Sequence, residues 1–143
     1  MYVGRIVSVA QTKDGRLCAM YRVSSRSFPN RQAVVNKDKV TIVPKAGYEG
    51  DVLKNPYISY NCLKTVLDGE VVVLSNGSHT DPIADKILNG ASTRDAIAMV
   101  LMALDFERDE YATPRIVAVV DKADGSGWLG IVRSDGLEVR RMN

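Results

Sequence analysis

The fold of this chain is decided by one stretch, Thr93-Arg94-Asp95-Ala96-Ile97-Ala98-Met99-Val100-Leu101-Met102-Ala103-Leu104-Asp105. Residues 96–104 are all apolar, and a helix without a polar stripe is normally buried on more than one side. Ser92 and Asp95 have the spacing of a capping box, which predicts where this helix begins. A helix of this kind needs a sheet or other helices to cover it.

The residues on either side of this helix predict what covers it. Asp81 and Pro82 indicate the start of a second helix, and Gly90 its end. The chain therefore runs from many strands, through two adjacent helices, to strands again, which is typical of an α+β fold with an antiparallel sheet covered by helices. With no internal repeat or linker, we expect a single domain over residues 1–143. Strand patterning predicts strands at 3–10, 17–24, 33–35, 40–43, 62–67, 70–74, 115–120, 128–132 and 137–141.

Composition restricts the kind of function. A formal net charge of +2 gives no global attraction to nucleic acid or to an anionic membrane, so any anion site must be local. The apolar run 96–104 is too short to span a bilayer, and residues 1–5 show no signal peptide. We therefore expect a cytoplasmic protein with Cys18 and Cys62 as free thiols. Phosphate-loop, dinucleotide-binding, zinc-protease and serine-elbow motifs are missing from the sequence, so metal and cofactor chemistry find no support.

The stretch Tyr21–Arg31 concentrates arginine, serine and asparagine without an acidic residue. If the strand before it continues through Arg26, alternation places Arg22, Ser24 and Arg26 on one face. Two guanidinium groups beside a hydroxyl can grip a phosphate or a carboxylate. The same pattern also fits a solvated arginine face on an edge strand.

Three further stretches place hydrogen-bonding residues where predicted strands end, and functional sites are often built there. In 55–61, two tyrosines and two asparagines could hold a planar ring, Tyr by stacking on it and Asn by hydrogen-bonding its edge. The same residues also fit a turn with half-buried tyrosines. In 75–81, amides before a helix attract anions and Gly77 allows close approach, while His79 fits capping and packing as well as proton transfer. In 105–111, four carboxylates fit either a solvated helix end or a general acid or base.

Taken together, these stretches closely resemble the archaeal-type inosine monophosphate (IMP) cyclohydrolase family. The matching strings are YRVSSRSFPNR, NPYISYN, SNGSHTDPIADK and, more loosely, DFERDEYATPRI. They occur in family order and, with the opening MYVGRIV, span nearly all of the chain. Several long strings in order are more specific than any single motif in this sequence.

The resemblance implies a reaction and a fold. The family closes the ring of 5-formamidoimidazole-4-carboxamide ribonucleotide (FAICAR) to IMP and water, the last step of purine synthesis, without a cofactor or a metal. Its fold resembles that of N-terminal-nucleophile hydrolases, a four-layer αββα sandwich, although no such nucleophile is used. Family members usually continue beyond residue 143, so we expect either a short or a truncated member whose sandwich is incomplete at the C-terminus.

The resemblance also implies roles for individual residues. Arginines would hold the phosphate, asparagines would hydrogen-bond the carboxamide or ribose, and a tyrosine would donate to the formyl oxygen. Which of the carboxylates in 105–111 relays the amide proton stays open, with Glu107 preferred, and Arg22 is an alternative for polarising the carbonyl. The expected catalytic residues are Arg22, Tyr60 and Glu107. The expected substrate-binding residues are Arg26, Asn30, Arg31, Asn76, Ser78 and His79.

Two other functions fit the same residues. One is a non-catalytic module that binds a purine nucleotide or phosphate but has lost the chemistry. The other is a single-stranded RNA binder with arginines and tyrosines in a stacking groove, which the small net charge disfavours. We expect a small-molecule nucleotide as substrate and neither nucleic acid nor membrane as a partner, and the family resemblance implies a homo-oligomer.

Overall fold

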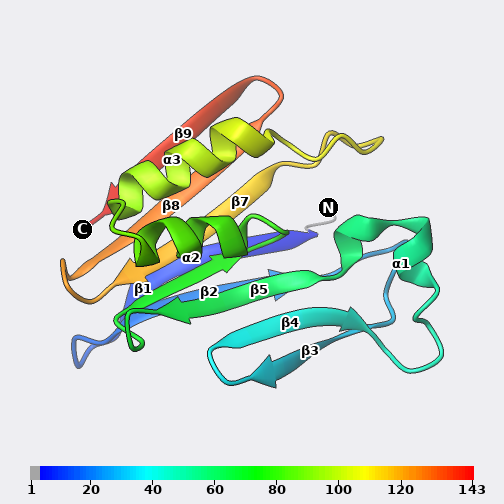
Figure 1. Ribbon diagram of the computed structural model, residues 1–143, viewed down its shortest axis with the longest axis horizontal. Helices are drawn as coiled ribbons and strands as arrows, with labels where there is room; N and C mark the ends of the chain where they lie inside the picture. Colours follow the sequence, from blue (N-terminus) through cyan, green and yellow to red (C-terminus); the bar gives the residue numbers. More distant parts are fainter. Residues whose placement is uncertain (1–3) are drawn as a thin grey trace.

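A seven-stranded antiparallel sheet carries most of the chain in the computed structural model, which describes residues 4–143. Its strands lie side by side in chain order, because each is followed along the chain by its neighbour in the sheet. Figure 1 shows this order as a progression of colour across the sheet. The strands are β3 (Arg31–Asn36), β4 (Lys39–Pro44), β5 (Tyr60–Val66), β6 (Val71–Ser75), β7 (Arg115–Asp121), β8 (Ser126–Arg133) and β9 (Gly136–Met142).

A separate hairpin packs against one face of this sheet. It consists of β1 (Arg5–Gln11) and β2 (Leu17–Val23), and it contacts strands β6, β7 and β8. The two sheets approach closely at Gly127, where a Cβ atom would lie 2.9 Å from the Cβ of Val9. Since alternate residues of a strand share a face, Arg5 lies on the same face of β1 as Val9 and points between the two sheets.

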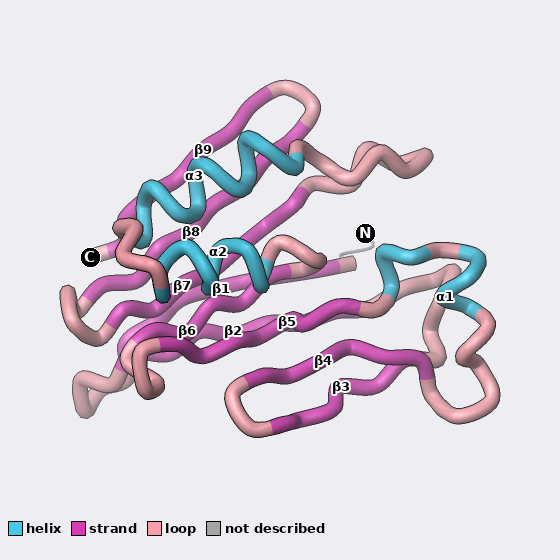
Figure 2. Tube along the Cα trace, viewed as in Figure 1, coloured by secondary structure: helices cyan, strands magenta, loops and turns pink. Residues whose placement is uncertain are grey.

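Two helices cover the opposite face of the large sheet (Figures 1 and 2). They are α2 (Thr80–Leu88) and α3 (Thr93–Leu104), and both belong to the connection between β6 and β7. The Ser92 side chain accepts a hydrogen bond from the amide of Asp95, which confirms the predicted start of α3. The main core lies between these helices and the sheet and is built from Val71, Val73, Ile83, Ala96, Ile97, Leu101, Val117 and Val119, among others.

The strand and helix order agrees with the prediction from sequence, and the boundaries differ in informative ways. The helix α2 begins at Thr80, so Asp81 lies in its first turn instead of capping it. Between β4 and β5 lie a short helix, α1 (Asp51–Lys54), and a 3-10 turn (Pro56–Ile58), neither of which the sequence analysis predicted. Cys18 and Cys62 are free thiols, as predicted. The predicted strand 3–10 begins at Arg5 in the part that is described.

The expectation that α3 is buried on more than one side was wrong. Ile97 and Leu101 are fully buried against the sheet, whereas Met99 is 44% and Met102 72% exposed. Within residues 4–143, α3 packs on the sheet and beside α2, and the side that carries Met99 and Met102 stays exposed.

Three layers are formed by residues 4–143, in the order helices, seven-stranded sheet and two-stranded hairpin (Figure 2). A second helical layer and the likeness to N-terminal-nucleophile hydrolases stay predictions. No helix in this part of the chain has both the length and the apolar character that crossing a membrane requires.

Gly130 of β8 provides a test of how tightly α3 packs on the sheet. A Cβ atom at this position would lie 2.5 Å from Ile97 Cγ2 and 2.8 Å from Val117 Cγ1. We expect Gly130→Ala to lower the free energy of unfolding by about 1–3 kcal/mol, because overpacking forces the helix away from the sheet. Gly136→Ala is the matched control, since no atom lies within 4 Å of its Cβ position. Equal urea midpoints for the two variants would contradict this description of the core.

Candidate functional site

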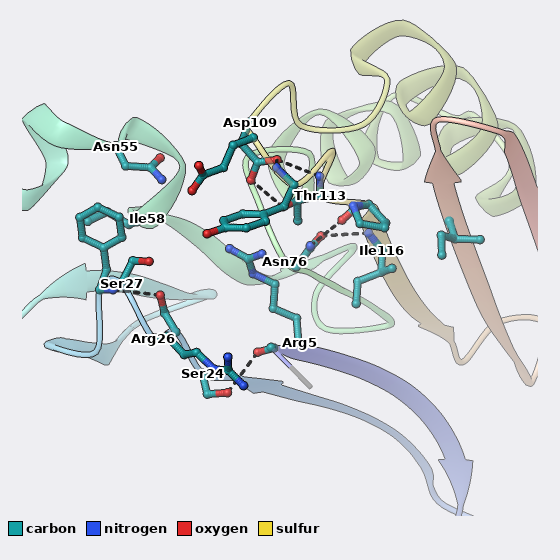
Figure 3. Close-up of a pocket in the computed structure, with 17 residues that line it drawn as sticks. Arg5, Ser24, Arg26, Ser27, Asn55, Ile58, Asn76, Asp109, Thr113 and Ile116 are labelled. Carbon is teal, nitrogen blue, oxygen red and sulfur yellow. Dashed lines mark hydrogen bonds between the residues drawn. The ribbon is translucent and has the colours of Figure 1, made fainter. Parts of the chain in front are cut away.

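A cavity of about 670 Å³ opens where the hairpin, the large sheet and two loops meet (Figure 3). Each of the four polar stretches identified in the sequence contributes to its wall. Arg26 comes from the first, Asn55 from the second, Asn76 from the third and Asp109 from the fourth. Residues that are far apart along the chain therefore converge on one cavity.

The segment that follows β2 reaches this cavity because β2 ends earlier than the sequence analysis predicts. The strand stops at Val23, and the amide of Ser24 donates a 2.7 Å hydrogen bond to the carbonyl oxygen of Gly4. The Ser25 hydroxyl then accepts a hydrogen bond from the amide of Phe28, which bends the segment across the opening. Arg26 is carried on this bend and lines the cavity.

The structure does not bring Arg22 to the cavity. The prediction that the strand continues to Arg26 was wrong, so the expected alternation of Arg22 with Ser24 and Arg26 is lost. Arg22 is exposed and, by strand alternation, lies on the face of β2 opposite to Tyr21. Ser78 is also exposed, and neither it nor Asn30 is among the residues that line the cavity.

Arg31 lies at the edge of the site and is held by backbone oxygens. Its Nε donates to the carbonyl of Phe28 at 3.2 Å, and its Nη1 donates to the carbonyl of Ile58 at 3.2 Å. It lines a smaller cavity of about 140 Å³ that shares Ser24, Ser25 and Phe28 with the large one. Arg31 therefore ties the segment that carries Arg26 to the loop before β5.

Asn76 is 1% exposed and joins the end of β6 to the start of β7. Its Nδ2 donates to the carbonyl of Pro114 at 2.9 Å, and its Oδ1 accepts from the amide of Ile116 at 2.9 Å. Figure 3 shows these bonds beside the cavity wall. Both polar ends of the side chain are thus bound to backbone, which favours a structural role over the expected hydrogen bond to substrate.

Tyr60 lies in a buried cluster next to the site but does not line the cavity. Its hydroxyl is 2.5 Å from that of Tyr21, and either group can be the donor. Burial raises the pKa of Tyr60 above its usual value, while the positive charges of Arg31 and Arg5 oppose this shift. Burial also raises the pKa of Tyr21, so both phenols are neutral hydrogen-bonding groups at neutral pH.

Glu107 is 1% exposed, and its carboxylate oxygens have no hydrogen-bond partner among residues 4–143. The nearest cation is Arg115, whose Nη1 lies 3.8 Å from Oε1. Burial raises the pKa of Glu107, although the charges of Arg5 and Arg115 oppose the shift. Glu107 lies behind the cavity wall instead of lining it.

Asp109 is the carboxylate from the same stretch that does line the cavity, together with Glu110. Burial by itself would raise the pKa of Asp109, but the hydroxyl and amide of Thr113 donate hydrogen bonds to it and leave its pKa below the usual value. Asp109 and Glu107 therefore have pKa values that are shifted in opposite directions, a pattern typical of groups with different proton-transfer roles.

Arg5 is a site residue that the analysis of the sequence missed. It lines the cavity, and its Nε is buried without a hydrogen-bond partner in the described part of the chain. Its charge acts on Glu107, on Tyr60 and on Asp109, so it links the carboxylates to the tyrosine pair. Strand alternation places Arg5 on the same face of β1 as Val9, but only the structure shows that this face is the inward one.

His79 is fully buried and does not line the cavity. Its Nε2 is 2.9 Å from the carbonyl oxygen of Ile116. Burial lowers the pKa of the imidazole to about 4, so the ring is neutral at physiological pH. This position does not agree with the expected contact between His79 and substrate.

Comparison with known proteins agrees with the resemblance seen in the sequence. The family model for IMP cyclohydrolase-like proteins matches residues 2–143. An IMP cyclohydrolase of Methanosphaera stadtmanae is 52% identical over 143 residues, covering all of this chain and 69% of the relative. One of Methanocella arvoryzae is 54% identical over 140 residues, covering 97% of this chain and 66% of the relative.

A third relative, an IMP cyclohydrolase of Methanocaldococcus jannaschii, is 47% identical over 143 residues, covering 99% of this chain and 67% of the relative. The chain thus spans about two thirds of the length of these relatives. The match extends over all four stretches that form the cavity. The chain therefore belongs to the IMP cyclohydrolase family.

Proposed function

We propose that this chain binds FAICAR in the large cavity and closes its ring to IMP. The observation that carries the proposal is the convergence of four distant polar stretches on one cavity, in a chain that belongs to the IMP cyclohydrolase family. A volume of about 670 Å³ lies in the range of sites for small ligands and fits a nucleotide monophosphate. Cytoplasmic location and homo-oligomeric assembly are parts of the same proposal.

Arg26 and Arg5 are the cations that line the cavity, and we assign them to the phosphate and to the reacting end respectively. Arg26 lies on an exposed bend with Ser25 and Ser27, where a phosphate can exchange with solvent. Arg5 lies between the sheets, and its charge acts on Glu107 and Tyr60. A half-buried guanidinium there stabilises negative charge on the formyl oxygen as the ring closes.

Ring closure needs two proton transfers to the formyl oxygen, which leaves as water. One proton comes from the carboxamide nitrogen that attacks the formyl carbon, and the other from the formamide nitrogen as the C=N bond forms. A carboxyl group with a raised pKa can both give and take these protons near neutral pH. Glu107 has that property, and we assign it this role, with contact to substrate made when the nucleotide fills the site.

Tyr60 supplies a hydrogen-bond donor in this scheme. When the Tyr21 hydroxyl donates to Tyr60, the hydrogen of Tyr60 is available for the formyl oxygen. Much of the rate enhancement then comes from holding the carboxamide and formyl groups in contact, because the reaction is intramolecular.

The assignment of Arg26 predicts a loss of affinity. Arg26→Ala should raise the dissociation constant for IMP by about tenfold to a hundredfold, since a charge-assisted hydrogen bond contributes about 1.5–3 kcal/mol. Arg22→Ala is the matched control because Arg22 is exposed and outside the cavity. Calorimetric titration with IMP measures both. Equal losses for the two variants would favour the face of alternating arginines expected from the sequence.

The carboxylates can be separated by two isosteric variants. Glu107→Gln should lower kcat by about 10²–10⁴, the usual contribution of general acid–base catalysis, and should leave IMP affinity nearly unchanged. Asp109→Asn should have the smaller effect on kcat, because Asp109 is already held ionised by Thr113. Product absorbance after FAICAR is added follows both reactions. The reverse order would transfer the acid–base role to Asp109.

Tyr60→Phe removes one hydroxyl from the tyrosine pair. We expect kcat to fall by about 10²–10³, the cost of deleting a donor to a developing oxyanion. Tyr48→Phe serves as the control, since Tyr48 is 46% exposed and remote from the cavity lining. If wild-type protein binds IMP and never turns over FAICAR, the chain is a nucleotide-binding module instead of an enzyme.

A further inference from the structure

Two aromatic side chains among the described residues line the large cavity, those of Phe28 and Tyr111. Phe28 is half-buried and also lines the smaller cavity, so its ring is shared between the two walls. Tyr111 is 73% exposed. A single exposed aromatic ring on a protein surface is ordinary, but one at the wall of a ligand cavity offers a planar surface to the molecule that enters the cavity.

The side chain of Asp109 holds the backbone on which Tyr111 is carried. Its Oδ1 accepts hydrogen bonds from the amides of Tyr111 and Thr113 at 3.2 Å and 2.9 Å. Its Oδ2 accepts a further bond from the Thr113 hydroxyl, and Figure 3 shows this pairing beside the cavity. The carbonyl of Asp109 accepts from the amide of Ala112 at 3.2 Å, which closes a β-turn with Tyr111 as its third residue.

The loop that contains this turn is also closed at its base. The amide of Glu107 donates to the carbonyl of Thr113 at 2.9 Å, so the two ends of the loop are joined. The backbone under Tyr111 is therefore set by hydrogen bonds within the protein, and its ring needs no ligand to reach the cavity wall.

The charges next to Tyr111 disfavour a phosphate beside its ring. Asp109 and Glu110 precede it in the sequence, and both line the cavity. The hydrogen bonds from Thr113 keep the pKa of Asp109 below its usual value, so this carboxylate is ionised at neutral pH and repels a phosphate. The uncharged part of a nucleotide, its ribose and base, fits this side of the cavity.

Arg26 connects Tyr111 to the phosphate end of the cavity. A hydrogen bond to Glu110 raises the pKa of Tyr111, and the charge of Arg26 opposes this shift. Arg26, which we assign to the phosphate, and Tyr111 are thus close enough to interact electrostatically. Only the ribose separates the phosphate from the base in a nucleotide monophosphate, so a phosphate on Arg26 can place its base against the ring of Tyr111.

The hydroxyl of Tyr111 already has a partner in Glu110, so the ring is the part of this side chain that is available to a ligand. We propose that Tyr111 recognises the base, by stacking its ring on the imidazole of the substrate and on the purine of the product. This inference rests on the proposed binding of FAICAR and IMP in the cavity. The imidazole ring is present before and after ring closure, so one stacking contact serves both molecules.

Two ligands separate stacking from the other contacts. IMP and ribose 5-phosphate share the phosphate and the ribose, and only IMP carries a base. Tyr111→Ala should raise the dissociation constant of IMP by about tenfold to a hundredfold, the usual loss when an aromatic ring under a base is removed. Tyr111→Phe keeps the ring and should change it by less than about threefold. Calorimetric titration should show ribose 5-phosphate bound equally by wild type and both variants.

Tyr48→Ala is the matched control for the loss of an exposed ring. Tyr48 is 46% exposed and does not line the cavity, so both dissociation constants should equal those of the wild type. Because Tyr111 is itself mostly exposed, Tyr111→Ala should also keep the urea midpoint of the wild type. A loss of IMP affinity then reports a lost contact instead of partial unfolding.

NMR of the bound ligand gives a second readout. Protons that lie over the face of an aromatic ring resonate upfield, so the base protons of IMP should move upfield on binding to wild type and to Tyr111→Phe. The shift should be smaller with Tyr111→Ala. No upfield shift with the wild type would refute the stacking contact.

The binding results distinguish this inference from the proposed function. If wild-type protein binds IMP and Tyr111→Ala binds it equally well, the stacking contact is refuted while the nucleotide site stands. Equal losses for IMP and ribose 5-phosphate would place Tyr111 against the phosphate or the ribose, and equal losses in Tyr111→Phe and Tyr111→Ala would make the hydroxyl the contact. Either result also refutes stacking. Wild-type protein that does not bind IMP would refute the nucleotide site and the stacking contact together.

Discussion

The site depends on the side-chain amide of Asn76. This amide joins β6 to β7, which are neighbours in the sheet although both long helices lie between them along the chain. The ladder between β6 and β7 ends at the pair Ser75 and Val117, and Asn76 continues it through Pro114 and Ile116. A buried amide with both ends bonded holds its neighbours in a fixed register, because losing either bond leaves an unpaired polar group. This fixes the loop that carries the carboxylates relative to the turn that carries Gly77 and His79.

The general architecture could be predicted from the sequence because its signals are local. Alternating apolar residues marked the strands, glycines marked the turns, and Ser92 with Asp95 marked the start of α3. The four polar stretches were identifiable because polar residues interrupted strong apolar patterns. In the structure each of these stretches contributes to the wall of one cavity.

The site residues that the sequence analysis missed or placed wrongly depend on tertiary contacts, which a single sequence does not encode locally. Arg5 reads as an ordinary strand arginine, and only the packing of β1 on the large sheet shows that it points inward. Arg22 reads as part of an arginine face, but β2 ends before that face can form. His79 is buried, and its Nε2 is paired with the carbonyl oxygen of Ile116, which is remote in sequence.

The close contact between Gly127 and Val9 has a consequence for the spacing between the hairpin and the large sheet, where the cavity opens. The missing side chain at Gly127 lets β1 rest directly on β8. Val9 and Arg5 are separated by four residues, or about 13 Å along an extended strand. A strand of that length is stiff, so a side chain added at Gly127 would move β1, and with it the guanidinium of Arg5, away from the large sheet. The hydrogen atom that Gly127 has in place of a methyl group therefore sets the distance between Arg5 and the carboxylates and tyrosine on which its charge acts.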